Sequence, residues 1–152
     1  MSVSWILAIV HLLPFSVGLS AVWARGRALR ETAGPQSLSR VFFADNVWGL
    51  AAIVWMVSGL LRAFGGFEKG ADYYLSNGLF WLKMGALILI LALEIWPMIT
   101  LIRWRIQLRR GQQPDARPAA ALARISYVQV ALTLLMAIAA AGMARGLGAN
   151  LF

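Results

Sequence analysis

The chain has 152 residues, of which 61% are hydrophobic, and its mean hydropathy is +0.72. The apolar share exceeds the roughly 45–50% of ordinary soluble domains. Its formal charge is +8, and it has no cysteine, which excludes disulfides and thiolate metal sites. The bases lie in loops between apolar segments and do not form a patch typical of nucleic-acid binding, so we expect a membrane protein with no nucleic-acid partner.

Four apolar segments each approach the ~20 residues that a helix needs to cross a bilayer. They cover residues 3–24, 41–64, 78–102 and 120–144. This pattern predicts an all-α fold, an integral membrane four-helix up-and-down bundle that forms a single transmembrane domain over residues 1–152. The first segment has its bases only after a full-length span, so we interpret it as a retained helix and not as a signal peptide.

The basic residues concentrate in two of the three loops. In loop 25–40, four arginines against Glu31 leave a net charge of +3. The six arginines from Arg103 to Arg124, in and beside loop 103–119, outnumber Asp115 by five. The positive-inside rule therefore predicts that both loops are cytoplasmic and that both termini are outside, in the periplasm, for a protein of a bacterial inner membrane.

The only histidine, His11, lies about three turns inside the first apolar segment. An ionisable side chain at membrane depth is costly and marks a functional or a paired group. Three interpretations are open: a neutral ring hydrogen-bonded to a neighbour, a haem or metal ligand, and a proton relay. Small residues on the same helix face, such as Gly18, allow another helix or a flat ligand to approach closely.

The second apolar segment has Asp45 near its start and Arg62 near its end. These residues are 17 positions apart, about 25 Å along a helix, so they cannot pair with each other. Each needs a partner from another helix, a loop or a ligand. For Asp45 the simplest interpretations are a helix cap or an ion pair with a loop arginine.

The third segment carries Lys83 and Glu94, which are eleven residues apart and therefore lie on the same helix face. About 16 Å separates them, so they too need other partners, and we expect a buried polar interior. Arg145, after the fourth segment, joins Arg62 and Lys83 as a third cation in the outer half. These cations suit the two propionates of a haem or porphyrin coordinated by His11; the alternative is that they snorkel to lipid headgroups.

Five tryptophans near segment ends are typical of a membrane-interface belt. They are Trp5, Trp23, Trp48, Trp81 and Trp104.

A series of short motifs resembles an uncharacterised family of small bacterial four-helix predicted membrane proteins. The motifs are Phe43–Gly49, Ser58–Arg62, Glu68–Gly70, Tyr73–Tyr74, Asn77–Lys83 and Glu94–Pro97, together with His11. That family is distantly similar to the membrane protoporphyrinogen oxidases and to the copper-resistance D-type membrane domain. The resemblance implies a b-type haem with His11 as its axial ligand, and with Asp45, Arg62 and Lys83 in the positions of the nearby acid and bases.

The leading hypothesis is a protein of the inner membrane that binds haem b or a porphyrin within the bundle. His11 is then the ligand of the haem iron, Arg62 and Lys83 lie near the propionates, and Asp45, Glu94 and Arg145 are further buried polar groups. Whether it is an enzyme, with redox activity on the tetrapyrrole, stays open. The alternatives are an accessory or assembly subunit of a larger membrane complex, and transport of a proton, metal or small anion along the Lys83–Glu94 face. Expected partners are membrane lipids and a homo-oligomer or larger complex.

Overall fold

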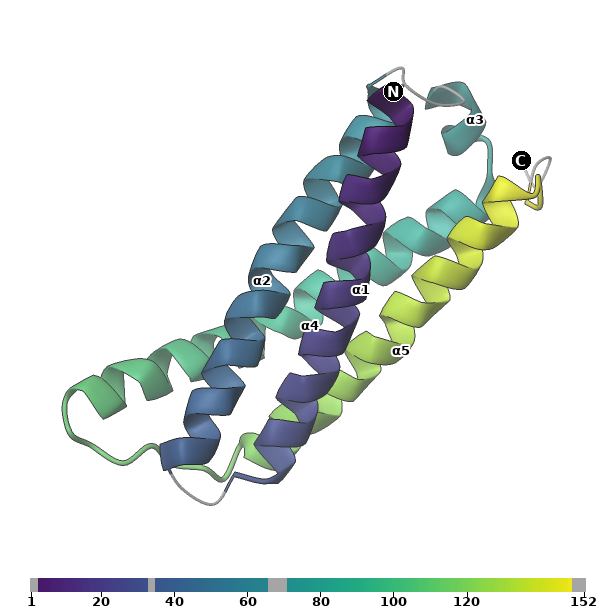
Figure 1. The fold of residues 1–152 in the computed structure, drawn as a ribbon. Coiled ribbons are helices and arrows are strands. Elements are labelled where there is room, and N and C mark those ends of the chain that lie inside the picture. Colours follow the sequence, from purple (N-terminus) through teal and green to yellow (C-terminus); the bar gives the residue numbers. More distant parts are fainter. Residues whose placement is uncertain (1–2, 33–34, 66–70, 149–152) are drawn as a thin grey trace.

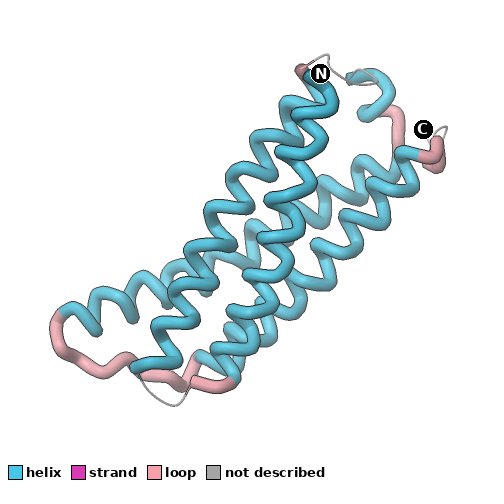
Figure 2. Tube along the Cα trace, viewed as in Figure 1, coloured by secondary structure: helices cyan, strands magenta, loops and turns pink. Residues whose placement is uncertain are grey.

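The computed structural model describes residues 3–32, 35–65 and 71–148, and Figure 1 shows its helices. They are α1 (Val3–Arg30), α2 (Pro35–Phe64), the short α3 (Ala71–Leu75), α4 (Gly78–Arg109) and α5 (Ala119–Ala144). The described part of the chain contains no strand (Figure 2). The predicted all-α fold is confirmed, and each of the four long helices has a stretch long and apolar enough to cross a membrane.

The predicted helices were too short at three ends. Helix α1 continues to Arg30 and α2 begins at Pro35, so most of the predicted loop 25–40 is helical. Helix α4 continues to Arg109, well beyond residue 102. Hydropathy marks the apolar thickness of a span, but arginine is a good helix former and a favourable residue in a last turn. Proline fits the first position of a helix, where no N–H bond is required.

The start of α1 and the end of α5 lie at one end of the bundle, here called the terminal end (Figure 1). The end of α1, the start of α2 and the α4–α5 connection lie at the other, the loop end. Helix α1 packs against α2 and α5, and α5 packs against α4. The backbones of α2 and α4 scarcely meet, although α4 is the next long helix after α2 in the chain. Side chains such as Trp48 and Trp55 of α2 and Ile90 of α4 join one central cluster between them.

The core consists of apolar layers inside the bundle, while many large apolar side chains point outward. Leu29, Val41, Leu101 and Leu122 belong to a fully enclosed layer at the loop end. By contrast Phe43 is 72% exposed, as suits a side chain in contact with lipid. The sequence therefore builds a bundle that is apolar on both its inside and its outside.

The tryptophan prediction was right for three of the five residues. Trp5, Trp23 and Trp81 are exposed, as an interface belt requires. Trp48 and Trp104 are buried, because they face neighbouring helices and not the lipid. Glu68–Gly70, one of the motifs that carry the family resemblance, lies outside the described residues.

Candidate functional site

A buried cluster of charged and polar side chains joins the four long helices in the half of the bundle nearer the loop end. At its centre is Arg25 of α1, whose side chain is 0% exposed. Its Nη1 donates to Asp45 Oδ1 at 2.8 Å and to Glu94 Oε1 at 2.6 Å. Its Nη2 donates to Glu94 Oε2 at 2.9 Å and to Gln129 Oε1 at 2.7 Å, and its Nε donates to Ser126 Oγ at 3.1 Å. All five guanidinium N–H donors are therefore used.

This cluster around Arg25 is here called the arginine network, and its carboxylate acceptors are held by further donors. Glu94 Oε2 accepts hydrogen bonds from Trp48 Nε1 at 3.1 Å and from Gln129 Nε2 at 2.7 Å. Asp45 Oδ2 accepts from Arg105 Nη2 at 2.8 Å. Two arginines thus face two carboxylates, which makes the network electrically balanced as well as saturated with hydrogen bonds. Its chemistry is that of a clamp between helices.

Of the two interpretations of Asp45, a helix cap or an ion pair with an arginine, the structure shows the ion pair. It also corrects the assignment of Arg25 and Arg105 to loops, since both lie within helices and bind partly buried acids. Gly26 allows this arrangement: a Cβ there would lie 3.1 Å from Tyr127 Cε1 and 3.2 Å from Ser126 Cβ, so α1 and α5 approach closely.

His11 is held against α2 by hydrogen bonds to both of its ring nitrogens. Trp55 Nε1 donates to His11 Nε2 at 3.0 Å, and an indole N–H can only donate, so Nε2 is unprotonated. The neutral ring then carries its proton on Nδ1, which donates to Ser58 Oγ at 3.0 Å. Ser58 in turn donates to the Trp55 carbonyl oxygen at 3.0 Å. Gly59 makes room for the ring, because a Cβ there would lie 3.1 Å from His11 Cε1.

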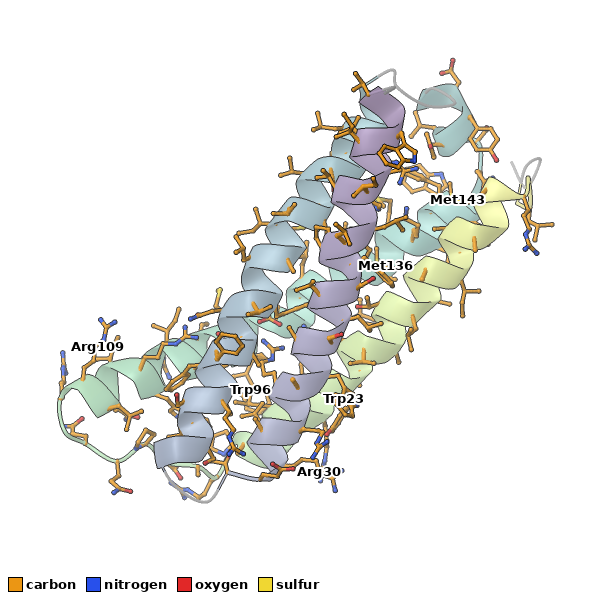
Figure 3. All side chains as sticks on the ribbon, viewed as in Figure 1. Trp23, Arg30, Trp96, Arg109, Met136 and Met143 are labelled. Carbon is orange, nitrogen blue, oxygen red and sulfur yellow. The ribbon has the colours of Figure 1, made fainter. Side chains whose placement is uncertain are left out.

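A cavity of about 150 Å³, here called the terminal cavity, lies beside this histidine toward the terminal end. His11, Arg62 and Lys83 all line it, so three of the predicted site residues meet there. Aromatic residues of α2, α3 and α4 line part of the remaining wall, together with Met136 of α5. Met136 is labelled in Figure 3. Lys83 forms no hydrogen bond or ion pair with the described residues. The terminal cavity is therefore mostly apolar, and the described residues that line it include two cations and no acid.

A groove of about 250 Å³ between α2 and α4, here called the α2–α4 groove, adjoins the terminal cavity through Trp55, Met56 and Leu87. Its other end reaches Asp45 and Glu94. The Lys83–Glu94 face of α4 thus borders the terminal cavity at one end and the arginine network at the other.

Arg145 does not join Arg62 and Lys83, contrary to the prediction of a buried group. It caps the end of α5, is exposed, and does not line the terminal cavity. The reason is the length of α5, which ends at Ala144 and so leaves Arg145 beyond the packed part of the helix.

A haem held by His11, as the sequence predicted, fits this site only in part. The two cations suit propionates. However, each nitrogen of His11 already has a hydrogen-bond partner, and Nε2 becomes available to iron only if Trp55 withdraws. The terminal cavity is also smaller than the roughly 300–1,000 Å³ of common cofactor pockets. The arrangement as it stands fits an acidic ligand but does not fit axial ligation by His11.

Comparison with family models gave a match over residues 3–148 to the family described as "Predicted membrane protein (DUF2214)". The chain belongs to this family. The DUF2214 match confirms the predicted family of membrane proteins and, with the four spans, identifies the chain as a membrane protein. No curated protein and no solved structure matches the chain. The more distant resemblance to protoporphyrinogen oxidases and the copper-resistance domain thus gains no support.

Proposed function

We propose that this membrane protein binds an apolar ligand that carries acid groups. The acid groups lie against Arg62 and Lys83 in the terminal cavity, and the apolar body lies between α2 and α4. The observation that carries the proposal is Lys83, a half-buried cation of a spanning helix with no ion-pair partner among the described residues. A charge at this depth is costly unless it is paired, and a carboxylate or phosphate supplies the missing counter-charge.

The walls of the terminal cavity favour a flat, aromatic body. Trp55, Tyr74 and Phe80 present their rings there, and such rings pack well against other aromatic systems. A tetrapyrrole, haem b or a porphyrin, is the ligand to test first, because it combines a flat apolar ring with two carboxylates. A ligand of this size also needs the α2–α4 groove, which adjoins the terminal cavity through Trp55, Met56 and Leu87.

The test compares protoporphyrin IX with its dimethyl ester, which has the same ring but no acid groups. Each is titrated into detergent-purified protein, and binding is measured by porphyrin absorbance and fluorescence. We expect the diacid to bind about tenfold more tightly than the ester. Lys83→Met lowers the diacid affinity by about tenfold and leaves the ester unchanged, since a charge-assisted hydrogen bond contributes roughly 1.5–3 kcal/mol.

Arg145→Met is the matched control, because it removes a cation from the same end of the bundle but outside the terminal cavity. It leaves both affinities unchanged. Equal binding of diacid and ester, or a diacid affinity that Lys83→Met does not alter, overturns the proposal.

Haem ligation by His11 is a separate prediction with its own measurement. If His11 holds the iron, His11→Ala shifts the Soret band of haem-loaded protein, whereas it leaves binding of the iron-free porphyrin intact. An unchanged spectrum removes His11 from the list of ligands. Redox activity on the tetrapyrrole also stays a prediction.

The alternative functions have less support. A transport path along the Lys83–Glu94 face of α4 leads to the arginine network. There Glu94 is hydrogen-bonded to Arg25, Trp48 and Gln129. A carrier or channel along this face must break those bonds. Docking into a larger complex or a homo-oligomer stays a prediction without a specific contact to argue from.

A further inference from the structure

A second groove, here called the α1–α2 groove, runs over the outside of these two helices in the half nearer the loop end. It consists of two adjoining hollows of about 450 and 530 Å³. None of the residues that line them lines the terminal cavity or the α2–α4 groove. It is therefore a separate candidate site.

The hollow nearer the membrane centre is an apolar trough. Val17 and Ala21 of α1 and Val47 of α2 line it together with Ser16 and Ser20. Both serines donate to carbonyl oxygens of their own helix, Ser16 to Leu12 at 3.2 Å and Ser20 to Ser16 at 2.9 Å. Their hydroxyl protons are thus already bonded within the helix. The trough offers an apolar occupant a surface without an unsatisfied donor.

The hollow nearer the loop end has a mostly apolar lining with two basic side chains. Arg27 of α1 and Arg40 of α2 line it from opposite sides, with Glu31 as its single acid. Arg27 lies 5.3 Å from the Trp23 ring centroid and pairs with Glu31 at 3.2 Å. Both partners of that ion pair are more than half exposed, so the pair is weak. A phosphate can therefore compete for Arg27.

The two hollows share Ala24, Phe43 and Ala44 and so form one continuous groove. It extends along α1 from Ser16 to Glu31, fifteen residues or about 22 Å. The hydrocarbon of one bilayer leaflet is about 15 Å thick. The groove is thus long enough for an acyl chain and the headgroup region above it.

We propose that the α1–α2 groove binds an anionic phospholipid. Its phosphate lies between Arg27 and Arg40, and one acyl chain follows the trough toward Ser16. The two arginines against one glutamate select an anionic over a zwitterionic headgroup. Trp23 and Arg30, labelled in Figure 3, lie at the same end of α1, at the level where headgroups are expected.

The test reconstitutes the whole protein in nanodiscs with equal amounts of phosphatidylglycerol and phosphatidylcholine that carry identical acyl chains. Native mass spectrometry then counts the lipids retained by each chain. We expect one phosphatidylglycerol per chain, retained about tenfold or more over phosphatidylcholine. The double variant Arg27→Gln/Arg40→Gln loses this preference. Ala24→Trp keeps both charges but fills the junction of the two hollows, and it lowers retention of either lipid.

Each variant has a matched control. Arg103→Gln/Arg124→Gln removes two exposed arginines from the loop-end half without touching the groove, and Ala92→Trp adds the same ring to an exposed position of α4. Both controls retain the lipid. Equal retention of the two lipids, or an equal loss in the arginine control, overturns the proposal. A dimer that Ala24→Trp abolishes also overturns it, because a second copy then occupies the groove.

Discussion

The arginine network and the terminal cavity contain similar residue types but use them in opposite ways. In the arginine network, Arg25 and Arg105 face Asp45 and Glu94, and every N–H donor of Arg25 is bonded. In the terminal cavity, Arg62 and Lys83 line an open volume together. A balanced and saturated set of charges stabilises the bundle, whereas a cation such as Lys83, with no ion-pair partner among the described residues, is suited to binding an anion. Charge alone therefore does not identify a site in a membrane; the presence of partners does.

The largest effect on stability is expected from the removal of Arg25, the centre of the arginine network. Arg25→Met leaves Asp45 and Glu94 with one arginine in place of two, so the free energy of unfolding falls by about 3–5 kcal/mol. The measurement is denaturant or thermal unfolding in a mild detergent. Arg27→Met, two residues along α1, changes an exposed side chain and serves as control. Equal stabilities of the two variants would mean that the arginine network is not a clamp.

A smaller loss of stability is expected when the close contact between α1 and α5 next to Arg25 is disturbed. In Gly26→Ala, the new Cβ meets Tyr127 and Ser126 at just over 3 Å, and separating α1 from α5 costs about 1–3 kcal/mol. Gly49→Ala is the control, because nothing lies within 4 Å of its Cβ position and alanine favours a helix. Unfolding curves of the two variants should shift in opposite directions. A shift of Gly26→Ala toward higher stability contradicts the packing described.

A smaller effect is expected from the hydrogen bonds that hold His11 beside the terminal cavity. Trp55→Phe removes the donor to Nε2 and lowers the free energy of unfolding by about 1 kcal/mol. In ¹⁵N-histidine-labelled wild type, NMR should show the proton on Nδ1, whereas Trp55→Phe should give a mixture of tautomers. Trp96→Phe, at an exposed position, leaves the tautomer unchanged. A wild-type proton on Nε2 contradicts the hydrogen bonds described.

The smallest effect on stability has the opposite sign. Lys83→Met removes a half-buried charge that lacks an ion-pair partner among the described residues, so the ligand-free protein becomes more stable by about 1 kcal/mol. The same variant weakens binding of an acidic ligand. Stability is measured by unfolding in ligand-free detergent, with Arg145→Met as an exposed control that stays neutral. A loss of stability in Lys83→Met would assign Lys83 to a structural role like that of Arg25.

Much of the fold was predictable because membrane spans have a local signal. A run of about 20 apolar residues specifies a spanning helix whatever surrounds it, and the four runs were located correctly. The same argument identified Asp45 and Glu94 as acids in need of partners. The prediction from hydropathy was wrong at the helix ends, where Arg25 and Arg105 were assigned to loops. The reason is that hydropathy measures the thickness of the apolar layer and not the length of the helix.

Local sequence patterns were thus sufficient to predict the fold class, the spans and the need for partners inside them. The identity of the partners depends on tertiary contacts, which pair Arg25 with the two acids, place Trp55 and Ser58 beside His11, and leave Arg145 exposed. The physical reason is that pairing depends on the rotation and crossing of helices. These are decided by contacts between residues far apart in sequence, such as Gly26 with Tyr127 and Gly59 with His11, and such contacts have no local signal.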